Sequence, residues 1–184
     1  MICALEARDQ LELDRVVWVP VGEPPHRHLA GDPGVEIRFE LCCRAVEGEE
    51  RFEVSREEMD RPGPSYTADT LARFEGADLF LILGGDQAAA LGAWHQPREV
   101  LRRATVAAVE RDDARRAQIA EAVDGVGHPG ARLVFLDMPR IELSSSLIRE
   151  RVLAGRPIRH LVPEGVERAI GEHDLYRRAL VRTH

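Results

Sequence analysis

The chain contains no lysine, so all 25 of its permanently charged basic side chains are arginines. Any grip on a phosphate group must therefore use arginine, histidine or backbone N–H groups. The formal net charge is −7 at pH 7. Because nonspecific binding to nucleic acid needs a basic face, this charge argues against a nucleic acid as partner.

Cysteines are few, and long apolar runs are absent. The three cysteines are Cys3, Cys42 and Cys43, an odd number with two adjacent and without the Cys-x-x-Cys spacing of zinc sites. We expect free thiols in a reducing cytoplasm. No stretch reaches the roughly 18 apolar residues of a transmembrane helix, and the N-terminus does not resemble a signal peptide. A cytoplasmic protein with no membrane partner is expected, and nothing in the sequence selects an oligomeric state.

Predicted strands and helices alternate along the chain. We expect strands at 16–19, 51–59, 79–83, 105–109 and 133–136, and helices at 2–11, 35–46, 66–74, 113–123, 144–153 and 164–173. The strands are mostly short continuous apolar runs, as in buried parallel sheets. This order predicts an α/β fold with a doubly wound parallel sheet. The length favours one domain over residues 1–184.

In open parallel sheets, ligands bind at the carboxyl ends of the strands, near a topological switch point. This rule selects three loops that follow predicted strands, at 21–28, 84–86 and 138–146. In the first loop, His26 and Arg27 follow two prolines and form a basic cluster that suits a phosphate or a carboxylate. An exposed basic loop without a ligand would explain the same residues.

The second loop consists of Gly84, Gly85 and Asp86. Glycines let a ligand approach the backbone closely, and Asp86 either accepts from ribose hydroxyls or caps the next helix. Further along, Trp94 and His95 follow a run of small side chains. A tryptophan in this position is either part of the core or a platform for a ring.

Two predicted helix starts carry hydroxyl groups. Ser65, Tyr66 and Thr67 lead into one helix, where Ser65 or Thr67 is a candidate cap and the free N–H groups favour a carboxylate. Three serines, Ser144, Ser145 and Ser146, begin another, and Arg149 lies about one turn further on. Such a start is typical of an anion site, although one serine acting only as an N-cap is the alternative.

Taken together, these segments resemble one enzyme family, the bacterial nicotinate-mononucleotide adenylyltransferases. The matching segments are Pro-Pro-His-Arg at 24–27, Ser-Tyr-Thr at 65–67, the tryptophan that follows Gly-Gly-Asp, and Ser-Ser-Ser-Leu-Ile-Arg at 144–149, where the family has Ser-Ser-Thr-x-Ile-Arg. The resemblance runs from Ala4 to Arg177. It implies a Rossmann-like nucleotidyltransferase fold and the transfer of AMP from ATP to nicotinate mononucleotide, with Mg²⁺, in NAD biosynthesis.

The resemblance also implies roles for individual residues. Trp94 is expected to stack on the pyridine ring, and Thr67 to face the ring and its carboxylate. The residues expected to bind the mononucleotide are His26, Arg27, Tyr66, Thr67, Trp94 and His95, and those expected to bind ATP are Gly84, Asp86, Ser144, Ser145, Ser146 and Arg149. Mg²⁺ is expected to arrive with ATP, without dedicated protein ligands.

The family also has a Gly-rich strand end and a His-x-Gly-His motif, which residues 1–184 do not contain. The resemblance implies that both precede Met1, so we expect a true start upstream, a fold without its first strand, and no catalytic residue within this chain. The alternatives are a nucleotide-binding fragment without catalysis and another adenylyltransferase of the same fold, such as the pantetheine-phosphate enzyme. Trp94 and the Ser-Tyr-Thr segment argue against the latter.

Overall fold

A computed structural model describes residues 1–24, 32–139 and 141–177. Its contacts separate two compact units, each built from two segments of the chain: Met1–Val16 with Pro64–Pro139, and Val17–Gly63 with Arg140–His184. We call them the first and the second unit. The single domain expected over residues 1–184 stays a prediction. Within the described residues, no helix has the length and apolar character needed to cross a membrane.

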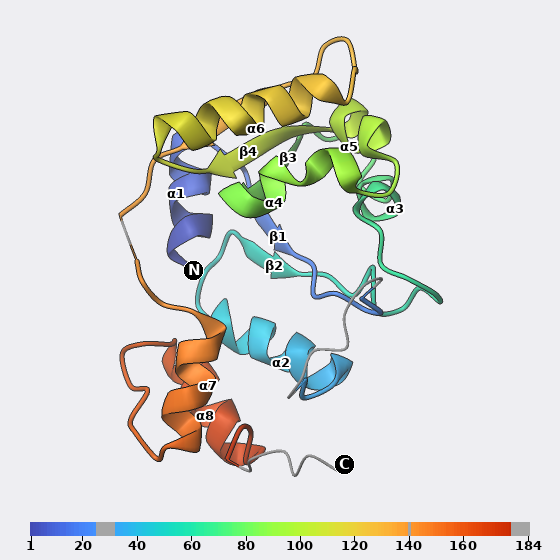
Figure 1. The fold of residues 1–184 in the computed structure, drawn as a ribbon. Coiled ribbons are helices and arrows are strands. Elements are labelled where there is room, and N and C mark those ends of the chain that lie inside the picture. The colour runs from blue at the N-terminus through green and yellow to red at the C-terminus, as the bar shows by residue number, and fades with distance from the viewer. Residues whose placement is uncertain (25–31, 140, 178–184) are drawn as a thin grey trace, which may run out of the picture. The chain divides into compact units, whose positions relative to one another are not determined.

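The first unit contains a three-stranded parallel sheet in the order β3-β4-β5, with β3 at Leu79–Gly84, β4 at Ala104–Val109 and β5 at Leu133–Leu136. Figure 1 shows its ribbon. Its helical segments are α1 (Ile2–Gln10), α3 (Thr67–Leu71), α4 (Gly85–Ala89), the 3₁₀ turn η1 (Leu91–Ala93), α5 (Pro97–Arg103) and α6 (Asp113–Gly125). The parallel pairing confirms the predicted α/β class.

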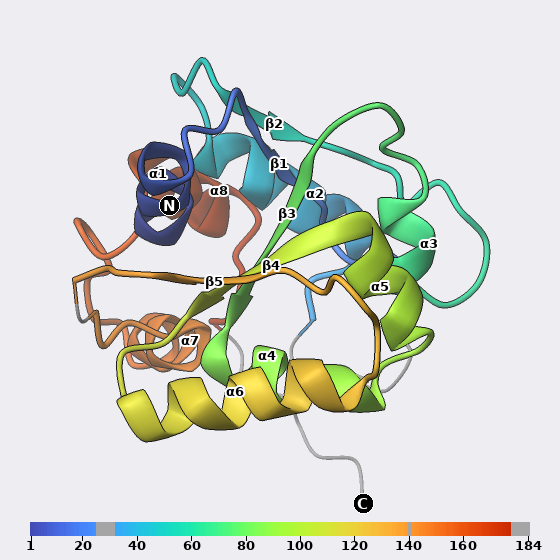
Figure 2. The same cartoon turned by 90° about the horizontal axis from the view of Figure 1, so that it is seen from above.

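Both faces of the central strand β4 are covered, and its successive side chains point to opposite faces of the sheet. Ala104 and Val106 of the central strand β4 join the core beneath α3, α5 and α6, and Ala108 packs with Ala88 of α4 and Ile119 of α6. The intervening Ala107 packs against Ala7 of α1. Figure 2 shows α4 and α6 on one side of the sheet and α1 on the other.

In its described residues, the second unit contains a two-stranded sheet and three helices. The elements are β1 (Val16–Trp18, which begins at the boundary), β2 (Phe52–Val54), α2 (Val35–Ala45), α7 (Ser145–Leu153) and α8 (Glu164–Glu172). Helices α2 and α8 pack so closely that a Cβ on Gly165 would lie only 2.8 Å from the carbonyl oxygen of Arg44. The absent side chain of Gly165 therefore permits the contact. His173 and Glu40 join the same two helices through a 2.8 Å contact.

Three local differences from the predicted elements have physical causes. The strand expected at 51–59 ends at Val54, because the N–H groups of Met59 and Asp60 both donate to the carbonyl of Arg56 and close a turn. The helix expected at 66–74 spans only Thr67–Leu71, since the chain tightens beyond it into three-residue turns. Helices α4 and α5 were not predicted, because five and seven residues are too few to show a helical period.

Candidate functional site

The carboxyl ends of β3, β4 and β5 form one edge of the sheet in the first unit, and each is followed by an acidic side chain. Gly84 ends β3 and precedes Asp86, Glu110 follows β4, and Asp137 follows β5. Asp86 does not cap α4, since Gly84 is the N-cap residue and no side chain accepts there. Its side chain is 80% exposed, and its carboxylate accepts a hydrogen bond of 2.8 Å from the guanidinium of Arg115.

Glu110 is the most enclosed of these acids, with 14% of its side chain exposed. Its Oε1 accepts from the backbone N–H groups of Arg111 and Asp112, at 2.8 and 3.1 Å. Its Oε2 lies 3.6 Å from Arg115. Asp112 in turn caps α6 by accepting from the N–H of Arg115 at 2.9 Å. The loop between β4 and α6 is therefore held by its own carboxylates.

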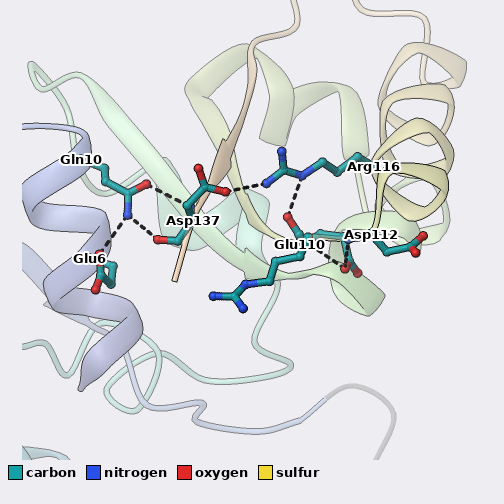
Figure 3. A network of polar contacts seen from close by, with 7 residues as sticks. Glu6, Gln10, Glu110, Asp112, Arg116 and Asp137 are labelled. Carbon is teal, nitrogen blue, oxygen red and sulfur yellow. Dashed lines mark hydrogen bonds and ion pairs between the residues drawn. The ribbon is translucent and has the colours of Figure 1, made fainter. Parts of the chain in front are cut away.

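Arg116 and Gln10 join the ends of β4, β5 and α1, as Figure 3 shows. Arg116 donates to the carbonyl of Glu110 at 2.7 Å and to the carboxylate of Asp137 at 2.8 Å. The side-chain amide of Gln10 accepts from the N–H of Asp137 at 3.0 Å and donates to its carbonyl. These bonds satisfy backbone groups that lie beyond the strand pairing and fix the segment leaving β5.

A second group of predicted residues also lies in the first unit. The rings of Tyr66 and His95 are stacked, with centroids 4.1 Å apart and an interplanar angle of 28°. Trp94, next to His95, is partly buried and packs against the large core cluster. The N-cap residue of α3 is Tyr66, whose side chain makes no capping hydrogen bond, and Thr67 is the first residue of the helix rather than its cap. The structure thus brings Tyr66 to His95, and Trp94 combines a core contact with an accessible surface.

The serine segment lies in the second unit, at the start of α7. Ser144 is the N-cap, and its Oγ accepts from the N–H of Leu147 at 3.1 Å. The capping alternative is therefore correct for this serine. Ser145 and Ser146 are exposed, and Arg149 is half-buried on the same helix. His26 and Arg27 lie outside the described residues.

Among the described residues, no group of three or more His, Cys, Asp or Glu side chains could hold a metal ion. The acids at the sheet edge are instead bonded to arginines and to backbone N–H groups. Such an arrangement can accept from the hydroxyl groups of a ligand, whereas phosphate oxygens need the arginines, the serine hydroxyls or free N–H groups.

Comparison with known proteins identifies the chain. A sequence model of the cytidylyltransferase-like family matches residues 1–151. A probable nicotinate-nucleotide adenylyltransferase of Dehalococcoides mccartyi is 35% identical over 183 residues, which cover 97% of this chain and 90% of the relative. One from Tropheryma whipplei is 37% identical over 181 residues, covering 96% and 91%. The chain belongs to the nicotinate-nucleotide adenylyltransferase family.

Solved structures agree on the fold of this family. The Plasmodium falciparum nicotinic acid mononucleotide adenylyltransferase complexed with NaAD has a TM-score of 0.66 and covers 97% of this chain and 92% of its own. Its sequence identity is 11%, so the likeness shows the fold alone. The suspected family and the α/β nucleotidyltransferase fold are therefore both confirmed.

Sequence reasoning missed Glu110, Arg115, Arg116 and Gln10. The rule that ligands bind at strand ends selected the loops after β1, β3 and β5 and left out the one after β4, where Glu110 lies. That omission was avoidable, because the rule applies to every parallel strand. Arg115 and Gln10 carried no local signal, since their partners lie 29 and 127 residues away in the sequence.

Proposed function

We propose that this chain transfers the AMP unit of ATP to nicotinate mononucleotide, giving nicotinate adenine dinucleotide and pyrophosphate for NAD biosynthesis. A phosphate oxygen of the mononucleotide attacks the α-phosphorus of ATP, and the bond from that phosphorus to the leaving pyrophosphate breaks. The protein contributes mainly by positioning the two substrates and neutralising charge. The observation that carries the proposal is family membership along 97% of the chain.

In this proposal the mononucleotide contacts Trp94, His95, Tyr66 and Thr67, together with His26 and Arg27. The contact between Tyr66 and His95 and the accessible surface of Trp94 support a ring-binding role for this group. The pyridine ring stacks on the indole of Trp94, while the stack with Tyr66 orients the ring of His95.

ATP contacts two further sets of residues in this proposal. Gly84 and Asp86 bind its nucleoside part, which the exposed carboxylate at the end of β3 supports. Ser144, Ser145, Ser146 and Arg149 bind its phosphates, supported by two exposed serines at the start of a nine-residue helix.

Mg²⁺ enters with ATP. When bound with ATP, it would neutralise phosphate charge. No three-carboxylate group in the described part of the chain offers it a protein cage. The reaction takes place in the cytoplasm, which the three free cysteines support.

The test is product formation by the protein with ATP and Mg²⁺. We expect pyrophosphate release and a dinucleotide, resolved by chromatography, when nicotinate mononucleotide is the second substrate. Nicotinamide mononucleotide and 4′-phosphopantetheine serve as parallel second substrates. Turnover with phosphopantetheine alone, or no dinucleotide from either mononucleotide, would contradict the proposal.

A further inference from the structure

Asp86 stands at the carboxyl end of β3 with one of its two carboxylate oxygens engaged. Its Oδ1 accepts from Nη2 of Arg115, on α6, at 2.8 Å. In the described part of the chain no group is bonded to Oδ2. Because both side chains are largely exposed, this pair contributes little to folding stability by itself. Its effect is to restrict the rotamer of Asp86.

Arg115 is itself held on its other side. Its Nη1 lies 3.6 Å from Oε2 of Glu110, so one guanidinium bridges two carboxylates. Glu110 is fixed in turn, because its Oε1 accepts from two backbone N–H groups and only 14% of its side chain is exposed. A continuous series of contacts therefore runs from the backbone after β4 through Glu110 and Arg115 to Asp86.

Gly85 makes room for this series. A Cβ placed on Gly85 would lie 2.5 Å from Oε2 of Glu110, so the carboxylate occupies the space that a side chain would take. Gly85 is not among the glycines with positive φ, and alanine fits its backbone conformation. The atom in the way is the end of a flexible side chain. An alanine at this position would therefore displace the carboxylate of Glu110 rather than unfold the helix.

We propose that Arg115 is a positioning residue for ATP, which together with Glu110 holds the Asp86 carboxylate so that Oδ2 faces a ribose hydroxyl. The inference rests on the proposed function, in which Asp86 binds the nucleoside part of ATP. A carboxylate that is ordered before the ligand arrives loses less side-chain entropy on binding. Lysine cannot do the same, because its single ammonium group does not bridge two carboxylates in the way a guanidinium does.

The experiment is calorimetric titration of ATP, with Mg²⁺ and without mononucleotide, into the protein. Arg115→Ala should raise the Kd of ATP about threefold to tenfold, with the Kd of nicotinate mononucleotide and the melting temperature little changed. The Kd of ATP for Arg115→Lys should lie between those of the unmodified protein and Arg115→Ala. Arg102→Ala is the matched control. Arg102 is 54% exposed, against 56% for Arg115, and it is also paired with a carboxylate, that of Glu99. It lies on α5, away from Asp86. This substitution should change neither Kd.

Gly85→Ala tests the series of contacts at a different point. It should raise the Kd of ATP by a similar factor, and the double variant Gly85→Ala/Arg115→Ala should bind no more weakly than either single variant, because both interrupt the same contacts. Losses that multiply in the double variant would overturn the inference. So would equal losses for ATP and the mononucleotide in Arg115→Ala.

Asp86→Asn separates this inference from the proposed function. If it weakens ATP binding while Arg115→Ala does not, the positioning role is wrong and the ATP site stands. If it leaves ATP binding unchanged, Asp86 is not a ligand for ATP and the role of Arg115 is wrong as well. Dinucleotide formation by the unmodified protein tests the proposed function independently of both results.

Discussion

Replacing Trp94 by alanine tests whether this residue is a ring platform or a part of the core. The structure gives it both kinds of environment, since it packs against the large core cluster and is only partly buried. Stacking of two rings contributes about 1 kcal/mol beyond burial, which corresponds to about a fivefold change in affinity. We therefore expect Trp94→Ala to raise the KM for nicotinate mononucleotide about fivefold and to leave the KM for ATP nearly unchanged.

The same substitution also removes core contacts. Truncation of a fully buried tryptophan costs about 3–5 kcal/mol, so a partly buried one should lower the free energy of unfolding by less, about 1–3 kcal/mol. Trp94→Phe keeps a ring for stacking and should recover most of the mononucleotide affinity. The control is Val100→Ala, which truncates a fully buried member of the same cluster. It should reduce stability by about 2 kcal/mol without selectively raising the mononucleotide KM.

Fluorescence provides a readout that stability does not affect. The chain has two tryptophans, so Trp18→Phe leaves Trp94 as the sole indole. Its emission should change on titration with nicotinate mononucleotide and much less with ATP. An unchanged spectrum at saturating mononucleotide, together with normal kinetics and reduced stability in Trp94→Ala, would refute the platform role and leave Trp94 as a core residue.

Three further predictions concern single side chains. Arg149→Ala should weaken ATP binding by about one to two orders of magnitude, since hydrogen bonds to charged groups contribute about 1.5–3 kcal/mol. Arg149→Lys should recover part of this loss, and the control Arg151→Ala, on the same helix, should bind ATP like the unmodified protein. Equal ATP affinity in all three variants would assign Arg149 a purely structural role. The hydrogen bond from Arg102 lowers the pKa of Glu99 from 4.5 to about 2. Because the folded pKa is the lower one, the stability gained from this carboxylate is complete above about pH 4.5 and is lost as the pH falls towards 2; an NMR titration of the carboxyl carbon with a midpoint near 4.5 would contradict this. Burial raises the pKa of the Cys42 thiol and of the other two thiols, so alkylation by iodoacetamide at pH 7 should be slow in the folded protein and fast after unfolding, and rapid modification of the native protein would disprove it.

The strands of the first unit could be predicted from the sequence because their signal is local. The runs in β3, β4 and β5 are apolar apart from Thr105, as expected for strands of a parallel sheet, and their bounds agree with the predictions to within one residue at each end. The short helices α4 and α5 could not be predicted in the same way. Pro97 occupies the first position of α5, where its ring is tolerated, but seven residues show no clear apolar face.

The sequence also placed Gly84 and Asp86 at a strand end and Ser144 at a helix start, because glycines, acids and serines have strong positional preferences at such points. The motifs identified the family for a similar reason, since each lies within a few consecutive residues. The cap of Ser144 is local in the same way, whereas the contacts of Asp86 and Asp137 were decided only by the tertiary structure. The partner of Asp86 is 29 residues away, and the backbone of Asp137 is bonded to a glutamine 127 residues earlier. Such pairs form when packing of helices on the sheet brings distant segments together, and neither local propensity nor hydrophobic period carries information about them.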